Sequence, residues 1–149
     1  MRKGYTSAIV ALAATGSLIT APTASAADAA PQGDFTVQWE SHITGALTGF
    51  ESRRWTVVGG SSTVNFTGCQ STEYGSDLNS THVGIWQDLT LQPDVRIGND
   101  ARLTACFNRS TSTFSRDIST GARVYFRIAR INGDVSGSRL SVDKVVVSE

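Results

Sequence analysis

The strongest constraint on the fold is a two-residue alternation of apolar and polar side chains. It recurs in short runs and is clearest over residues 122–131. One side of that run consists of Val124, Phe126 and Ile128, and the other of Arg123, Tyr125 and Arg127. Successive side chains of a β-strand point to opposite faces of a sheet, so the run predicts a strand with one buried face. No stretch shows the apolar spacing of a long amphipathic helix.

Similar runs, separated by residues that favour turns, predict about eight short strands. The runs cover 35–40, 55–58, 63–67, 82–91, 103–107, 122–131 and 139–147, and the polar stretch 108–121 is either a loop or an edge strand. This pattern favours a small antiparallel β-sandwich, Ig-like or jelly-roll-like, with a small barrel as the alternative.

The last two of these strands are expected to form a hairpin. Asn132-Gly133 follows the first of them, and this dipeptide readily adopts the positive φ angles of a tight turn. Gly137 leaves room for a longer connection, so the register stays open. The alternation in the returning strand slips near Lys144, which indicates a β-bulge.

Residues 1–26 have the features of a secretory signal peptide. Arg2 and Lys3 precede an apolar run that Pro22 ends, and Ala24-Ser25-Ala26 matches the small-x-small pattern of a cleavage site. The apolar run is too short and too polar for a permanent membrane anchor. We therefore expect export, and we expect no permanent anchor.

The remaining chain divides into residues 27–33, an expected flexible N-terminus, and residues 34–149, a single β domain. After residue 26, Lys144 is the only lysine among many arginines. That bias is typical of GC-rich coding and suggests a bacterial source. The sequence thus predicts a secreted, extracellular bacterial protein.

The charge balance limits the classes of partner. The chain has 13 basic and 13 acidic side chains, a formal net charge of zero, and 17% charged residues. Such a composition is ordinary for a folded domain, and it provides no polybasic segment for nucleic acid. We therefore expect no nucleic-acid partner.

Cys69 and Cys106 are the only cysteines. In an oxidising compartment they are expected to form a disulfide, because no Cys-x-x-Cys pair and no neighbouring histidine marks either of them as reactive. A redox or nucleophilic cysteine is the alternative. On the chain-entropy model, closing this loop stabilises the fold by roughly 3–4 kcal/mol.

Signals for catalysis are weak. His42 and His82 are the only histidines, and no Gly-x-Ser-x-Gly motif accompanies them. Glu40 and Glu51 are candidate paired acids only because they flank one loop. A small hydrolase that uses either histidine with nearby acids stays a minor alternative to a protein without catalytic residues.

Signals for metals and cofactors are weaker still. The sequence has no His-Glu-x-x-His, no Cys/His cluster and no EF-hand loop. Asn99-Asp100 and Asn132-x-Asp134 offer oxygen ligands to calcium, but turns favour the same residues. We expect no metal site and no cofactor.

Trp86 lies on the less apolar face of the expected strand 82–91. An indole on a sheet face can stack on a sugar ring, with Asp88 nearby to accept hydroxyl protons. Tyr125, flanked by Arg123 and Arg127, forms a second amphipathic face. The alternative is that another layer or chain covers these aromatic residues and that they serve packing alone.

Arg53 and Arg54 form the other candidate site, in the loop 49–54. They are suited to an acidic partner or to the cleavable basic site of a protease inhibitor. The alternative is a solvated loop whose arginines pair with Glu51.

These observations lead to one preferred function and two alternatives. The preferred hypothesis is a non-catalytic binding module for extracellular polysaccharide or the cell surface, with Trp86 and Tyr125 in its site. The first alternative is a protein-binding module for a secreted or cell-surface protein, such as a protease inhibitor, that uses loop 49–54 or 108–121. The second is the small hydrolase. The oligomeric state is left open.

Overall fold

The computed structural model describes residues 36–72 and 74–149 of the chain. These residues form eight strands and one short 3-10 turn, with no α-helix among them. The expected signal peptide (1–26), the expected flexible N-terminus (27–33) and Phe35 lie outside the described residues. No helix in the described part of the chain is both long enough and apolar enough to span a bilayer.

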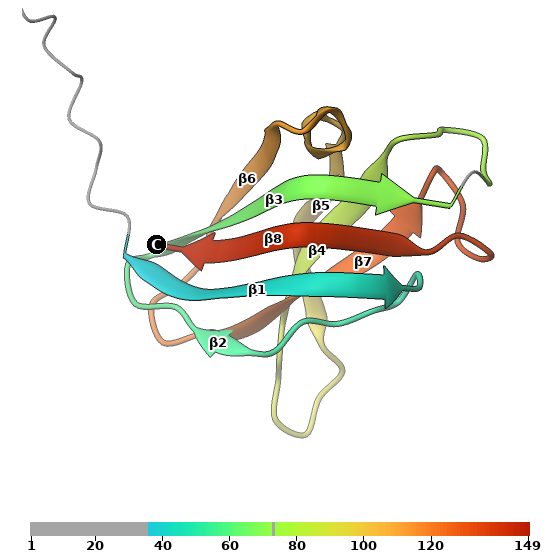
Figure 1. Ribbon diagram of the computed structural model, residues 1–149. Coiled ribbons are helices and arrows are strands. Elements are labelled where there is room, and N and C mark those ends of the chain that lie inside the picture. The colour runs from blue at the N-terminus through green and yellow to red at the C-terminus, as the bar shows by residue number, and fades with distance from the viewer. Residues whose placement is uncertain (1–35, 73) are drawn as a thin grey trace, which may run out of the picture. The chain divides into compact units, whose positions relative to one another are not determined.

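The strands form two antiparallel sheets of four (Figure 1), which confirms the predicted all-β fold. Sheet A has the order β1 (Val37–Ala46), β8 (Leu140–Ser148), β3 (Ser61–Ser71), β6 (Thr111–Asp117). Sheet B has the order β2 (Trp55–Thr56), β7 (Arg123–Ile131), β4 (Thr81–Gln87), β5 (Val95–Leu103). The 3-10 turn η1 (Ala105–Asn108) connects β5 to β6.

The strand order is that of a jelly roll. β1 pairs with β8, β2 with β7, β3 with β6 and β4 with β5, as if one long hairpin had been wrapped into a sandwich. Only the connection between β4 and β5 therefore stays within one sheet. In Figure 1 that connecting loop extends away from both sheets.

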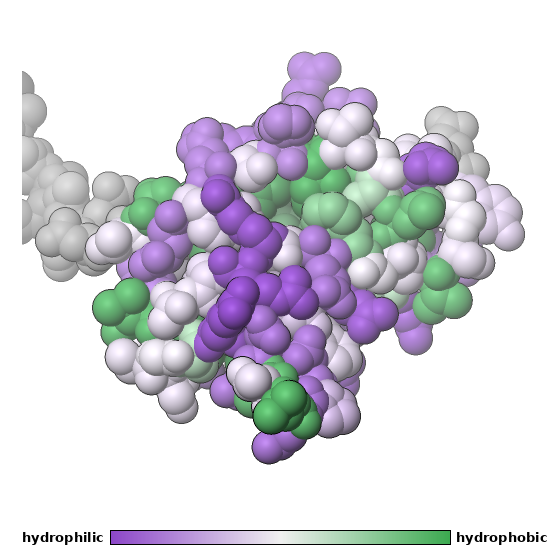
Figure 2. Space-filling model, turned by 90° about the horizontal axis from the view of Figure 1, so that it is seen from below, coloured by the Kyte–Doolittle hydropathy of each residue, from purple (hydrophilic) through white to green (hydrophobic). Residues whose placement is uncertain are grey.

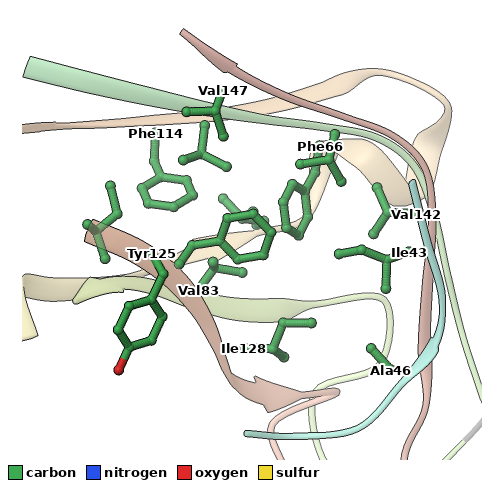
Figure 3. Packing of buried hydrophobic residues seen from close by; sticks show 14 of the residues in the cluster. Ile43, Ala46, Phe66, Val83, Phe114, Tyr125, Ile128, Val142 and Val147 are labelled. Carbon is green, nitrogen blue, oxygen red and sulfur yellow. The ribbon is translucent and has the colours of Figure 1, made fainter. Parts of the chain in front are cut away.

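The core lies between the two sheets and comes from the apolar parity of each strand. Ile43, Phe66 and Val142 of sheet A face Val83 and Ile128 of sheet B (Figure 3). Each of these side chains is at least nine-tenths buried. Burial of apolar surface, about 25 cal/mol for each Å² removed from water, is the main force that holds the sheets together.

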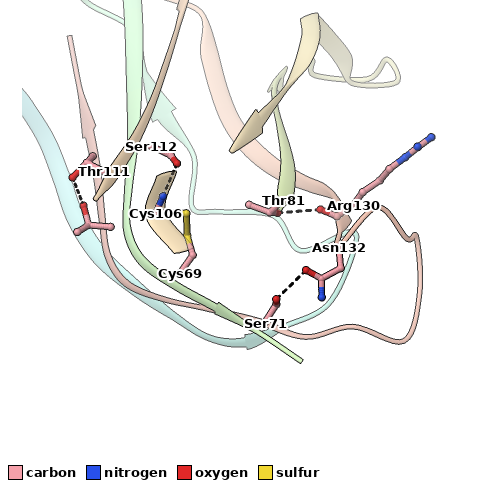
Figure 4. The surroundings of a disulfide bond; sticks show 9 residues. Cys69, Ser71, Thr81, Cys106, Thr111, Ser112, Arg130 and Asn132 are labelled. Atoms are coloured by element: carbon pink, nitrogen blue, oxygen red, sulfur yellow. Dashed lines mark hydrogen bonds between the residues drawn. A yellow bond between two sulfur atoms is a disulfide. The ribbon is translucent and has the colours of Figure 1, made fainter. Parts of the chain in front are cut away.

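The predicted disulfide forms between Cys69 on β3 and Cys106 in η1 (Figure 4). Their Cα atoms are 5.0 Å apart. The backbone N–H of Cys106 donates to Ser112 Oγ at 2.9 Å, which fixes the turn that carries this cysteine. The bridge thus ties sheet A to the segment that leaves sheet B.

The predicted hairpin between the last two strands is wrong. Asn132 and Gly133 do have positive φ angles, and Ile131 and Asp134 exchange backbone hydrogen bonds across them, so the tight turn is present. The chain then crosses to the other sheet, where β8 pairs with β1 and β3. The turn residues specify the local reversal, but the strands that pair with β8 are decided by the tertiary fold, which places β8 between β1 and β3.

Two predicted strand boundaries are also wrong. The strand expected over 82–91 ends at Gln87, and Leu91 in the following loop is fully exposed. The strand expected over 103–107 instead comprises Val95–Leu103, and Cys106 lies in the 3-10 turn that brings it to Cys69. Gly98 continues the strand with a positive φ, so the residues expected to form a turn form an irregular strand.

Two finer predictions are confirmed. The register of β8 against β1 shifts where Asp143 and Lys144 lie, which is the predicted bulge. The polar stretch 108–121 contributes β6, an edge strand of sheet A.

Candidate functional site

The outer face of sheet B carries most of the residues that the sequence singled out. In the strand register, Trp86 of β4 lies opposite Tyr125 of β7 on one side and opposite Arg96 of β5 on the other. We use the name Trp86 face for the surface formed by Trp86, Asp88, Arg96, Arg123 and Arg127. Successive side chains of β4 and β7 point alternately into the core and onto this surface. The buried residues of these strands therefore hold the side chains of the Trp86 face in place.

Trp86 is partly exposed at the centre of this face, and its inner edge packs against the core. The guanidinium of Arg127 lies 5.4 Å from the indole centroid, which is cation–π distance. Among the described residues, no carboxylate forms an ion pair with Arg127. Arg127 therefore holds the indole on one side and keeps N–H donors free for a ligand.

Tyr125 shares the outer side of sheet B but is only 2% exposed. Its hydroxyl donates to Asp94 Oδ2 at 2.8 Å, and Arg54 covers its ring at 4.5 Å from the centroid. Burial and the hydrogen bond to Asp94 raise the pKa of Tyr125 to about 12. Tyr125 thus supports the face from below, and a ligand does not reach its ring unless Arg54 moves.

Charged side chains link the Trp86 face to the edge of sheet B. Asp88 Oδ2 accepts from Arg54 at 3.1 Å and lies 3.2 Å from Arg123. Arg54 also reaches Glu51 at 3.2 Å. Figure 2, seen from the side of β2 and of the β4–β5 loop, shows strongly hydrophilic residues in a continuous band. Donors and acceptors therefore alternate beside the indole.

Gly84 makes room for a second charged pair next to Trp86. Asp100 lies directly over Gly84, where a Cβ atom would collide with its carboxylate. Arg96 Nη1 lies 3.2 Å from Asp100 Oδ2. The absence of a side chain at position 84 therefore lets an arginine–carboxylate pair lie flat on the sheet beside the indole.

Arg53 and Arg54 point to different sides of the molecule, as neighbours in an extended segment do. Arg54 joins the cluster around Asp88, and its pairing with Glu51 matches the solvated-loop alternative. Arg53 lies 4.4 Å from the ring centroid of Trp39. Backbone bonds from Gly49 and Ser52 to β7 hold the segment against sheet B, so it does not protrude as a reactive loop would.

A cleft of about 300 Å³ lies where Arg53 meets Trp39, and the sequence analysis missed it. We call it the β1 cleft. It opens between the edge strand β1 of sheet A and segment 50–53 at the edge of sheet B. Trp39 is half-buried in its wall. Residues 39–43 and 50–53 lie on two sides of this cleft because the β1 edge of sheet A lies beside the segment at the edge of sheet B. No local pattern in the sequence reveals that these two sheet edges lie side by side.

Among the described residues, neither histidine side chain forms a hydrogen bond with an acid or a nucleophile, although Asp77 and Asp100 lie near enough to His82 to affect its pKa. His42 is exposed on β1 beside the cleft, whereas His82 lies on the outer side of sheet B. Burial and the nearby Arg130 lower the pKa of His82, and its buried Nδ1 has no hydrogen-bond partner among the described residues. Glu40 pairs with Lys144 and Glu51 with Arg54, so each acid is occupied.

Of the two oxygen-rich segments, Asn99-Asp100 lies within β5, and the turn at Asn132 is held by its own side-chain hydrogen bonds. The Asn132 side chain donates to the carbonyls of Thr72 and Tyr74 and accepts from Ser71 Oγ (Figure 4), which fixes the crossover to β8. Within residues 36–72 and 74–149, no group of three or more His, Cys, Asp or Glu residues is arranged to hold a metal ion.

Comparison with protein-family models, with curated proteins and with solved structures found no match to this chain.

Proposed function

We propose that this protein is an extracellular, non-catalytic binding domain and that its ligand is a polysaccharide held on the Trp86 face. The observation that carries the proposal is the partly exposed indole at the centre of a sheet face lined with arginines and carboxylates. Jelly rolls host both lectin domains and unrelated functions, so the argument rests on the site and not on the fold.

The chemistry of this face suits a sugar. An indole offers an apolar surface to the C–H side of a pyranose ring, and paired carboxylates and guanidinium groups accept and donate to its hydroxyls. Arg96 and Asp100 lie on one side of Trp86, and Asp88 and Arg123 lie toward its other end. A polymer that crosses the strands would meet both pairs.

The two alternatives have less support. A protease inhibitor needs an exposed binding loop, whereas segment 49–54 is bonded along β7 and 108–121 supplies an edge strand. A hydrolase needs a histidine beside a nucleophile or an acid, and neither histidine has such a hydrogen-bonded partner in the described residues. Secretion and a bacterial source remain part of the proposal, and the disulfide is compatible with an oxidising compartment.

Co-sedimentation of the purified protein with cellulose, chitin and peptidoglycan tests the proposal. We expect the wild type to pellet with at least one polymer, and Trp86→Ala to bind at least about tenfold more weakly, because truncation of a central interface Trp costs about 2 kcal/mol or more. Tyr74→Ala is the matched control, since Tyr74 is a 62% exposed aromatic residue in a different loop.

Thermal unfolding of each variant separates lost binding from lost fold. Retained binding by a folded Trp86→Ala variant, or an equal loss in Tyr74→Ala, would contradict the assignment of the site. Failure of the wild type to pellet with any of the three polymers would contradict the polysaccharide proposal, and capture of secreted proteins would then test the first alternative.

A further inference from the structure

The β1 cleft is a built cavity outside the Trp86 face. Its floor consists of Trp39, Ile43, Phe126 and Val145, which come from both sheets. Trp39 and Phe126 stack with their centroids 6.1 Å apart and their planes at 25°. The floor therefore belongs to the core packing, and Trp39 is the one of these four side chains that is partly exposed, since Ile43, Phe126 and Val145 are each at most 6% exposed.

The mouth of the cleft adds a third ring. Phe50 lines the cavity and is 38% exposed. Its backbone N–H donates to Leu47 O at 3.0 Å, and Leu47 is also exposed. An exposed aromatic side chain at the mouth of the cleft favours a ligand with an apolar, planar body.

Charge at the rim is positive. Arg53 lies over Trp39 and donates one hydrogen bond to the backbone carbonyl of Glu40 at 3.2 Å. No carboxylate among the described residues forms an ion pair with Arg53, because Glu40 pairs with Lys144 and Glu51 with Arg54. A guanidinium has five N–H donors, so several remain for a ligand.

We propose that the β1 cleft binds a small aromatic carboxylate. The ring lies between Phe50 and the exposed edge of Trp39, above the buried floor, and the carboxylate accepts from the free N–H groups of Arg53. The cavity of about 300 Å³ is at the small end of ligand sites, which fits a compact molecule and not a polymer. Because Arg53 is already held by Trp39 and Glu40 O, little side-chain entropy is lost on binding.

Isothermal titration of the purified protein with 2-naphthoate, and with the neutral 2-naphthamide, tests this inference. We expect a Kd below about 1 mM for the acid and a Kd about tenfold higher for the amide, because a hydrogen bond between charged groups is lost. Arg53→Gln should raise the Kd of the acid by about tenfold. The matched control is Arg54→Gln, which removes the neighbouring charge on the other side and should change the Kd less than twofold.

Each other outcome overturns the inference. Absence of wild-type binding below about 1 mM overturns the site, and equal affinity for acid and amide overturns the carboxylate. An equal effect of Arg53→Gln and Arg54→Gln overturns the role of the cleft. If Arg53→Gln fails to fold, Phe50→Ala replaces it, because this exposed side chain contributes to the cleft and little to the core. Polysaccharide pelleting by Arg53→Gln should equal that of the wild type, which separates this site from the Trp86 face.

Discussion

The outer faces of the two sheets differ far more than their inner faces do. The outer face of sheet A carries short hydroxyl and amide side chains that bond to one another across β3 and β6. The hydroxyl oxygens of Thr63 and Ser115 are 2.7 Å apart, and so are those of Thr67 and Thr111. The hydroxyl of Thr113 donates to Asn65 Oδ1 at 2.6 Å. Pairs of this kind are the ordinary stabilising units of an antiparallel sheet.

The outer face of sheet B carries long arginines and carboxylates around an indole. Their charged ends lie several bonds from the backbone, and Arg127 has no carboxylate partner among the described residues. On sheet A the short polar groups of β3 and β6 pair with one another, and β1 and β8 add an ion pair between Glu40 and Lys144. On sheet B some donors remain available. The two sheets thus share one core but differ outside it, because the polar groups of β3 and β6 are short and pair with one another, whereas sheet B carries long charged side chains around an indole.

The largest effect should come from removing the disulfide between β3 and the 3-10 turn η1. We expect the double variant Cys69→Ala and Cys106→Ala to lose roughly 3–4 kcal/mol of unfolding free energy, because the sequence separation of 37 residues closes a long loop. Urea denaturation monitored by tryptophan fluorescence measures this loss. A loss under about 1 kcal/mol would mean that the unfolded chain without the disulfide is already restricted.

The second prediction compares one side-chain hydrogen bond on each face. Tyr125→Phe removes the bond from the buried phenol to Asp94 and should cost roughly 1–2 kcal/mol, because the acceptor is a carboxylate. Thr67→Val removes an exposed hydroxyl pair on sheet A and should cost less than about 0.5 kcal/mol. Urea unfolding of both variants tests the comparison, and equal losses would show that the two faces do not differ in stability.

The smallest effect concerns pH. A bidentate contact with Arg102 lowers the pKa of Asp77 to about 2, and a hydrogen bond from Ser80 contributes. A carboxyl whose pKa is lower in the folded state stabilises the fold above its unfolded pKa, and this contribution disappears as the pH falls from about 4 to about 2. Asp77→Asn should therefore show a weaker loss of unfolding free energy over that interval than the wild type.

Thr67→Val serves as the control for the pH series, because it removes no ionisable group. Its stability should fall with pH in parallel with that of the wild type. Parallel curves for Asp77→Asn as well would show that the pair between Asp77 and Arg102 is too exposed to affect folding.

Local patterns in the sequence were sufficient for several elements of the fold and for part of the site. The alternation over 122–131 predicted β7, and the slip near Lys144 predicted the bulge of β8. The same parity argument placed Trp86 on the outer side of its sheet. It also placed Tyr125 there, but it did not reveal that Arg54 and Asp94 cover it, because both covering residues come from other segments.

The sequence by itself determined the β class, the parity of β3, β4 and β7, and the pairing of the two cysteines, because each follows from spacing along the chain or from counting. Only the tertiary structure decided that β8 joins sheet A, that 103–107 turns toward Cys69, and that Trp39 and Arg53 meet in a cleft. These features depend on which apolar surfaces, from segments far apart in the sequence, are buried against one another. The hydrophobic effect is non-directional, so a local sequence pattern does not specify which distant segment a strand packs against.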